Sequence, residues 1–178
     1  MSEFTITPEL VRRLSAGRWL MPILAAMADS GGSRFSVLER QLKVSKSVLS
    51  ATLARLEAAG WVCRNPGHGH PLRPEYLLTG EGRGVAGWCE KVIAQRRALG
   101  LEPGAFGRWS LPLIGEIGGG WRRFSALQRG LAPISPRALS LELASLSDAA
   151  LVDRRAPGPL YGLTGRGVRF AANVSLPG

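Results

Sequence analysis

One pattern of residues occurs twice in this 178-residue chain, in the same order and at an offset of 90, 89 or 85 positions. The matched sets are Gly17–Trp19 with Gly107–Trp109, Pro22 with Pro112, Arg34–Ser36 with Arg123–Ser125, Leu38 and Leu42 with Leu127 and Leu131, Ser45, Leu49, Ser50, Leu53 and Leu56 with Ser135, Leu139, Ser140, Leu143 and Leu146, Val62 with Val152, and Tyr76, Leu78, Thr79, Gly80 and Gly82 with Tyr161, Leu163, Thr164, Gly165 and Gly167. The small changes in offset indicate short insertions or deletions in loops. A period of this length is too long for a solenoid unit and fits a small domain. The sequence therefore predicts two copies of one domain.

Residues that interrupt helices and strands mark the boundary between the copies. Gly100, Pro103 and Gly104 lie close together there, and such clusters favour turns. We expect a first domain at residues 1–98 and a second domain at residues 99–178.

A long helix is predicted at the end of the first domain, over residues 84–99. Val85, Trp88, Cys89 and Val92 recur at helical spacing and give this helix one apolar stripe. The stripe docks either against the second domain or against another chain, and we favour the second domain.

Each copy begins with a helix, a short strand fragment and a second helix. In the first copy, apolar residues from Trp19 to Met27 fall at helical spacing, and Arg34-Phe35 is long enough only for a strand fragment. Ser36 and Glu39 have the spacing of a capping box, in which the hydroxyl and the carboxylate each bond one unpaired amide of the helix start. The second copy keeps this spacing with Ser125 and Gln128.

A third helix follows a turn in each copy. Ser45 and Ser135 are placed to cap these helices, and Pro136 suits the first helical position. Leucines at i, i+4 and i+7 give each helix one buried face. Gly60 is a favourable stop for the first helix, whereas Ala150 occupies the corresponding position in the second copy.

Two strands, a loop and a last helix complete each copy. The strands are expected at residues 61–64 and 75–78 in the first copy and at 151–154 and 160–163 in the second, with Thr79 and Thr164 as caps of the last helices. The loops between the strands are rich in proline and glycine and cannot lie inside a sheet. This order predicts a mainly α fold with small β-wings (α+β), namely a tandem duplication of winged helix-turn-helix domains.

The ordered motifs of both copies resemble a known family. They are Arg18-Trp19, Arg34–Ser36, Ser45–Leu49, Leu53–Glu57, Gly60–Val62 and Tyr76–Gly82 in the first copy, and Arg108-Trp109, Arg123–Ser125, Ser135–Leu139, Leu143–Leu146 and Tyr161–Gly167 in the second. Together they resemble the HxlR-type branch of the MarR-like winged helix regulators. The resemblance implies bacterial transcriptional regulation with double-stranded DNA as the partner. Members typically pair as homodimers of a single module, so two modules in one chain imply a pseudo-dimer within the chain, with a homodimer of the chain as a further possibility.

The charge of the chain agrees with a polyanionic partner. The formal net charge is +10, and 20 of the 23 basic residues are arginine. Residues 1–90 carry 11 basic and 8 acidic groups, and residues 91–178 carry 12 and 5. Arginine suits DNA because its planar fork of donors matches phosphates and guanine edges.

In a winged helix, the third helix enters the major groove and the wing contacts the backbone or the minor groove. The candidate DNA-binding residues of the third helices are Ser45, Lys46, Ser47, Ser50 and Arg55 in the first copy and Ser135, Arg137 and Ser140 in the second. The candidates of the wings are Arg64, His68, His70, Arg73, Arg154 and Arg155. Arg137 is the best candidate for a guanine edge, and Glu142 could accept from a cytosine amine.

Other chemistry has less support. Both histidines lie in one loop, and no nucleophile elbow, phosphate-binding loop or paired-carboxylate motif is present, so we expect no enzyme activity and no cofactor. Gly82–Gly87 has dinucleotide-binding spacing but no parallel βαβ unit around it. Cys63 with His68 and His70 lacks a fourth ligand for zinc, so we expect no metal site.

The cellular context follows from the remaining features. Cys63 and Cys89 indicate a reducing compartment and read as small buried apolar residues, with a redox-sensing thiol as the alternative. The sequence shows no pattern of a signal peptide or a membrane span, so a cytoplasmic protein is expected. A small-molecule effector is left open. The alternative functions are a plasmid or chromosome replication or partition protein that binds DNA, and a tandem winged helix scaffold for other proteins.

Overall fold

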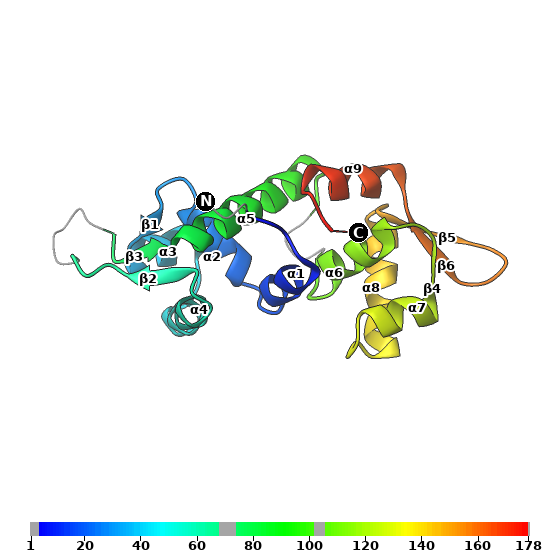
Figure 1. The fold of residues 1–178 in the computed structure, drawn as a ribbon, viewed down its shortest axis with the longest axis horizontal. Coiled ribbons are helices and arrows are strands. Elements are labelled where there is room, and N and C mark those ends of the chain that lie inside the picture. The colour runs from blue at the N-terminus through cyan, green and yellow to red at the C-terminus, as the bar shows by residue number, and fades with distance from the viewer. Residues whose placement is uncertain (1–3, 68–73, 102–105, 178) are drawn as a thin grey trace. The chain divides into compact units, whose positions relative to one another are not determined.

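The computed structural model describes residues 4–67, 74–101 and 106–177, and both repeats adopt the same order of elements (Figure 1). The first repeat comprises α2 (Leu20–Met27), β1 (Gly32–Ser33), α3 (Phe35–Leu42), α4 (Lys46–Ala58), β2 (Val62–Arg64), β3 (Tyr76–Leu78) and α5 (Gly80–Ala98). The second comprises α6 (Ser110–Gly118), β4 (Arg122–Arg123), α7 (Phe124–Gly130), α8 (Pro136–Asp148), β5 (Val152–Arg155), β6 (Leu160–Leu163) and α9 (Gly165–Asn173). This order confirms the predicted winged helix fold class.

Each repeat contains one three-stranded antiparallel sheet. The strand orders are β1-β3-β2 and β4-β6-β5, so the first short strand pairs with the last strand of its repeat in both cases. In each pairing a glycine faces a bulky residue, and the strand that carries the bulky residue differs between the two copies. A Cβ at Gly32 would lie 2.9 Å from Leu77, whereas a Cβ at Gly162 would lie 2.7 Å from the Trp121 ring. The two sheets therefore keep one register, but the large side chain comes from the last strand in the first copy and from the residue before β4 in the second.

The predicted leucine faces of the third helices are confirmed. Leu49, Leu53 and Leu56 in α4, and Leu139, Leu143 and Leu146 in α8, are all at most 3% exposed. Burying these side chains stabilises each helix far more than its own propensity does, because isolated helices of 13 residues are marginal in water.

The predicted caps of α4 and α8 are also confirmed. The Ser45 hydroxyl accepts from the Val48 amide at 3.4 Å, and the Ser135 hydroxyl accepts from the Ala138 amide at 3.2 Å. Gly60 follows the end of α4 with φ +75°. Its counterpart Ala150 adopts the same left-handed region with φ 54°, which costs an L-residue free energy.

The predicted capping box is wrong. The first helical residue of α3 is Phe35 and that of α7 is Phe124, so Ser36 and Ser125 lie inside their helices. The Phe35 amide donates instead to the Glu75 carboxylate at 3.3 Å, and the Phe124 amide donates to the Pro159 carbonyl at 3.3 Å. In both repeats, a residue just before the last strand of the sheet thus accepts the hydrogen bond of the first helical amide.

The compact units of the structure divide the chain differently from the repeat. The N-terminal unit contains Phe4 and residues 17–93, and the C-terminal unit contains residues 5–16 and 94–177, apart from the undescribed positions. Helix α1 (Pro8–Ser15) therefore belongs with the second repeat.

Helix α1 packs against α6, and its Arg12 guanidinium donates to the Gly130 carbonyl at 2.5 Å. Leu10, Val11 and Leu14 form its buried stripe. The Thr7 hydroxyl accepts from the Leu10 amide at 3.2 Å and caps this helix, which is not among the predicted elements.

The long helix predicted over residues 84–99 is present as α5. Val85, Trp88, Cys89 and Val92 are at most 4% exposed and lie in the N-terminal unit, while its last turn lies in the C-terminal unit. In that last turn, Gln95 accepts a hydrogen bond from Asn173 at 3.0 Å. None of the helices in the described ranges combines the length and apolar character that a membrane crossing demands.

Candidate nucleic-acid interface

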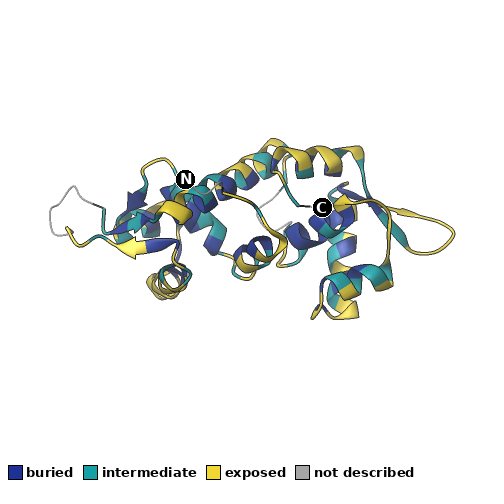
Figure 2. Cartoon of the chain, viewed as in Figure 1, coloured by how far each residue is buried: buried dark blue, intermediate teal, exposed yellow. Residues whose placement is uncertain are grey.

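Helix α4 exposes small polar and basic side chains opposite its leucines. Ser45, Lys46, Ser47, Ser50 and Arg55 are all exposed, and Figure 2 shows much of the outward surface of α4 as exposed. The predicted residues of this helix therefore share an accessible surface. The Arg55 guanidinium lies over Gly17, because a Cβ there would stand 2.7 Å from its Nη1 atom.

Helix α8 exposes a different set at the same positions. Ser135, Arg137 and Ser140 are exposed, and no carboxylate pairs with Arg137 within the described residues. Leu141 is also exposed on this helix, at 63% of its surface. Leu141 is not among the predicted contacts, although its place outside the buried leucine spacing is a signal for exposure.

Glu142 does not face outward as a base contact requires. Its side chain is half-buried, and its carboxylate accepts a hydrogen bond from the fully buried Ser110 hydroxyl. The same hydroxyl accepts from the Gly107 amide at 2.9 Å. The predicted contact of Glu142 with cytosine is therefore wrong, since this carboxylate joins α8 to the start of α6.

The arginine of the first wing is held by carboxylates. Arg64 lies 3.5 Å from Glu57 and 3.2 Å from Glu75, and its guanidinium lies 4.5 Å from the Tyr76 ring centroid. Burial raises the pKa of Tyr76, although the nearby positive charge of Arg64 opposes that rise. Two acidic groups therefore offset the charge of Arg64 where a phosphate would have to bind.

The second wing lacks these carboxylates. Arg154 corresponds to Arg64, while Ser147 and Leu160 stand in place of Glu57 and Glu75. Arg154 and Arg155 are exposed, and neither has an ion pair among the residues that the structure describes. The Arg155 guanidinium lies 4.1 Å from the Trp121 ring centroid, which orients it by a cation–π contact.

The short strand β4 adds two positive charges to this sheet. Arg122 and Arg123 are both exposed, whereas the β1 residues Gly32 and Ser33 are buried. Arg123 belongs to the family motif, but neither arginine is among the predicted DNA contacts. The pairing of β4 with β6, which a local pattern cannot reveal, brings them to the same sheet as Arg154.

Three predicted wing residues lie outside the described residues, namely His68, His70 and Arg73. Among the described residues, no group of three or more His, Cys, Asp and Glu side chains is placed to share a metal ion.

The two cysteines differ in their surroundings. Cys89 is fully buried, as predicted, and burial raises the pKa of its thiol. Cys63 is exposed, so the prediction of a buried residue is wrong for it. Its strand alternates between faces, and the side chain of Cys63 falls on the outer one.

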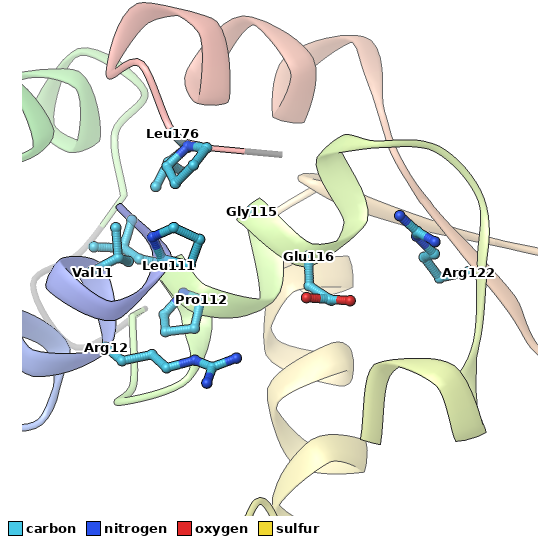
Figure 3. Close-up of a pocket in the computed structure, with 10 residues that line it drawn as sticks. Val11, Arg12, Leu111, Pro112, Gly115, Glu116, Arg122 and Leu176 are labelled. Carbon is cyan, nitrogen blue, oxygen red and sulfur yellow. The ribbon is translucent and has the colours of Figure 1, made fainter. Parts of the chain in front are cut away.

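A pocket of about 250 Å³ lies within the C-terminal unit, between α1, α6 and the last residues of the chain (Figure 3). Val11, Leu111 and Pro112 give it apolar walls, Arg12 and Arg122 give it positive charges, and Glu116 gives it a negative charge. Arg12 and Glu116 reach the end of α7: Arg12 donates to the Gly130 carbonyl, and a Cβ on Gly130 would stand 2.5 Å from the Glu116 carboxylate. Two residues that line the pocket thus lie against the end of the helix that precedes α8.

Comparison with known proteins agrees with this geometry. The model of the HxlR-like helix-turn-helix family matches residues 14–97 and again residues 106–174. A protein from Methanothermobacter thermautotrophicus, described as an uncharacterized HTH-type transcriptional regulator, is 32% identical over 84 residues, which are 47% of this chain and 63% of that relative. The chain thus spans less than two thirds of the length of this relative. No solved structure gives a significant match. Since the family model covers most of the chain in two consecutive segments, this protein belongs to the HxlR-like helix-turn-helix family.

Proposed function

We propose that this protein is a transcriptional regulator that binds double-stranded DNA sequence-specifically, with α4 and α8 as reading helices and the wings on the backbone or the minor groove. Membership of a helix-turn-helix family, a formal net charge of +10 and two exposed reading helices support this function. Phosphate contacts fix a protein on the duplex, and contacts with base edges specify the sequence.

The exposed N-terminal turn of α8 carries the proposal. Ser135 caps this helix, and Arg137 is exposed two residues later with no carboxylate partner among the described residues. A helix N-terminus favours a phosphate because its amides and its dipole both attract negative charge. An arginine in this same turn is then within reach of a guanine edge.

The two half-sites of the proposed operator differ in sequence. Lys46 and Ser47 open α4, whereas Pro136 and Arg137 open α8. If the two helices enter successive major grooves, the half-sites lie about 10 base pairs apart, or a multiple of that distance. A footprint of only a few base pairs would contradict this arrangement.

Selection of bound sequences from random duplexes, followed by mobility shift at several salt concentrations, tests the function. We expect a conserved asymmetric site and a steep loss of affinity with salt, because each neutralised phosphate releases counterions. Binding without sequence preference would contradict a sequence-specific regulator. Absence of any salt-dependent binding would contradict DNA as the partner and would favour a protein scaffold.

Replacement of Arg137 by alanine tests the reading helix directly. We expect R137A to relax specificity at one base pair and to cost about 1–3 kcal/mol of binding free energy. R169A removes an equal charge from α9 and serves as the matched control. An equal loss of affinity on all sequences would make Arg137 a phosphate contact instead.

A further inference from the structure

The exposed leucine of α8 has no structural role within its own unit. Leu141 is 63% exposed, more than Val168 at 53% or Trp121 at 36%. Trp121 at least covers Gly162 and supports Arg155. Leu141 leaves most of its apolar surface in water, and a polar residue would serve the fold equally well there.

The position of Leu141 is the middle of the outward face of α8. It follows Arg137 by four residues and precedes Ala144 by three, and residues at these spacings lie on one face. The leucines at positions 139, 143 and 146 occupy the opposite, buried face. Leu141 and Arg137 are thus the two long side chains on the surface proposed to enter the groove.

The first repeat carries truncated side chains at the same positions. Ser47 stands in place of Arg137, and Ala51 in place of Leu141. The two reading helices share their caps and buried leucines but differ at the centre of their exposed faces. A difference at that centre is expected where the two helices read different sequences.

We infer that Leu141 reads a thymine through its methyl group, roughly two base pairs from the one that Arg137 reads; this inference rests on the proposed function. The thymine C5 methyl is the apolar group that the major groove presents, and aliphatic side chains contact it. Four residues of helix rise by about 6 Å, so the thymine lies roughly two base pairs from the guanine. The site of α4 contains no such methyl contact at the corresponding base pair.

The surroundings of Leu141 favour DNA over a protein partner. The adjacent side chains on this face are Arg137, Ser140 and Ala144, which do not form a continuous apolar patch. A protein-binding surface would need a larger contiguous apolar area. The net charge of the chain also favours a polyanion.

Deoxyuridine substitution tests this reading, because it removes one methyl group and leaves the base pairing unchanged. In the selected duplex, each thymine is replaced singly, and affinity is measured for the full-length protein. We expect one position at which the loss of the methyl weakens binding about three- to tenfold. L141A should weaken binding to the thymine duplex by a similar factor and bind thymine and deoxyuridine duplexes equally. V168A removes exposed aliphatic surface from α9 and should keep the response of the unmodified protein.

Three outcomes would overturn the inference while leaving the proposed function intact. Duplex binding without any methyl-sensitive position is the first, and an L141A variant that keeps the methyl response is the second. The third is an L141A variant that binds DNA normally but changes its mass in sedimentation, which would assign Leu141 to a contact between proteins. Absence of salt-dependent duplex binding in the unmodified protein would instead overturn the proposed function itself.

Discussion

The Thr164 hydroxyl donates a hydrogen bond to the Ala150 carbonyl at 2.7 Å, and so connects the start of α9 to the turn that follows α8. In the first repeat the Thr79 hydroxyl makes the same bond to the Gly60 carbonyl at 2.7 Å. Each hydroxyl also accepts from the amide three residues later, at 3.0 Å. One threonine per repeat therefore fixes the turn after α4 or α8 relative to the start of the last helix.

Replacing Ala150 by glycine should stabilise the C-terminal unit. Ala150 has φ 54°, a left-handed conformation that costs an L-residue about 1–2 kcal/mol, and the flexibility of glycine in the unfolded chain offsets part of that gain. We expect A150G to raise the free energy of unfolding by about 1 kcal/mol in denaturant titration. The matched variant is G60A, since Gly60 has φ +75° and open space around it. A loss of stability in A150G, or none in G60A, would contradict this account.

Replacing Gly82 or Gly167 by alanine should be strongly destabilising. A Cβ at these positions would lie 1.8 Å from the Trp61 carbonyl oxygen and 2.1 Å from the Leu151 carbonyl oxygen. Backbone atoms cannot yield as a flexible side chain can, so we expect each variant to lose about 3 kcal/mol or more. The control is G80A, because nothing lies near a Cβ there. Thermal unfolding that leaves G82A as stable as G80A would disprove the close packing.

The two wing arginines should respond differently to alanine substitution. Arg154 has no ion pair among the described residues, so we expect R154A to reduce the salt slope of DNA binding by about one phosphate contact. Arg64 contacts Glu57 and Glu75, and its side chain is 61% exposed. We expect R64A to leave the salt slope nearly unchanged and to lower stability by at most about 1 kcal/mol, since exposed ion pairs are screened. Equal slopes for R64A and R154A would show that Glu57 and Glu75 do not keep Arg64 from binding a phosphate.

The two thiols should differ in their reaction with iodoacetamide. Burial raises the pKa of the Cys89 thiol and also hides its sulfur, whereas Cys63 is exposed. We expect mass spectrometry at neutral pH to find rapid alkylation of Cys63 and modification of Cys89 only after unfolding. C63S is the control, because it should abolish the rapid reaction.

The raised pKa of Cys89 also has a consequence for stability. The thiol ionises at lower pH in the unfolded chain than in the folded protein, so its contribution to stability is complete below the ordinary pKa of 9.0 and is lost as pH rises above it. Replacing Cys89 by alanine should remove this alkaline loss, although the cavity will lower stability at all pH values.

The features that depend on local spacing could be predicted from the sequence. Ser45, Ser135 and the leucines of α4 and α8 follow the period of their own helices, so their roles as caps and core need no knowledge of the rest of the fold. The start of α3 could not be predicted in this way. The Glu75 carboxylate, 40 residues away, meets the Phe35 amide and removes the need for Ser36 as a cap.

The candidate DNA contacts also divide into those that local spacing predicts and those that depend on long-range contacts. Exposure of Arg137 follows from the helical period, whereas the half-burial of Glu142 depends on Ser110, which is 32 residues away. Arg122 and Arg123 belong to a strand of two residues, whose pairing with β6 no local pattern indicates. Helix α1 had its own local signals in Thr7 and Pro8, but its packing on α6 is a long-range contact.

The packing of α1 on α6 has a consequence for synthesis on the ribosome. Arg12 and its hydrogen-bond partner Gly130 are 118 residues apart, so α1 leaves the exit tunnel long before its binding surface has been translated. Its apolar stripe therefore stays uncovered while the first repeat folds, a period in which nascent chains are prone to aggregate or to recruit chaperones. A gene cut between the repeats would leave α6 without this cover, so the second repeat is expected to fold poorly when it is expressed by itself.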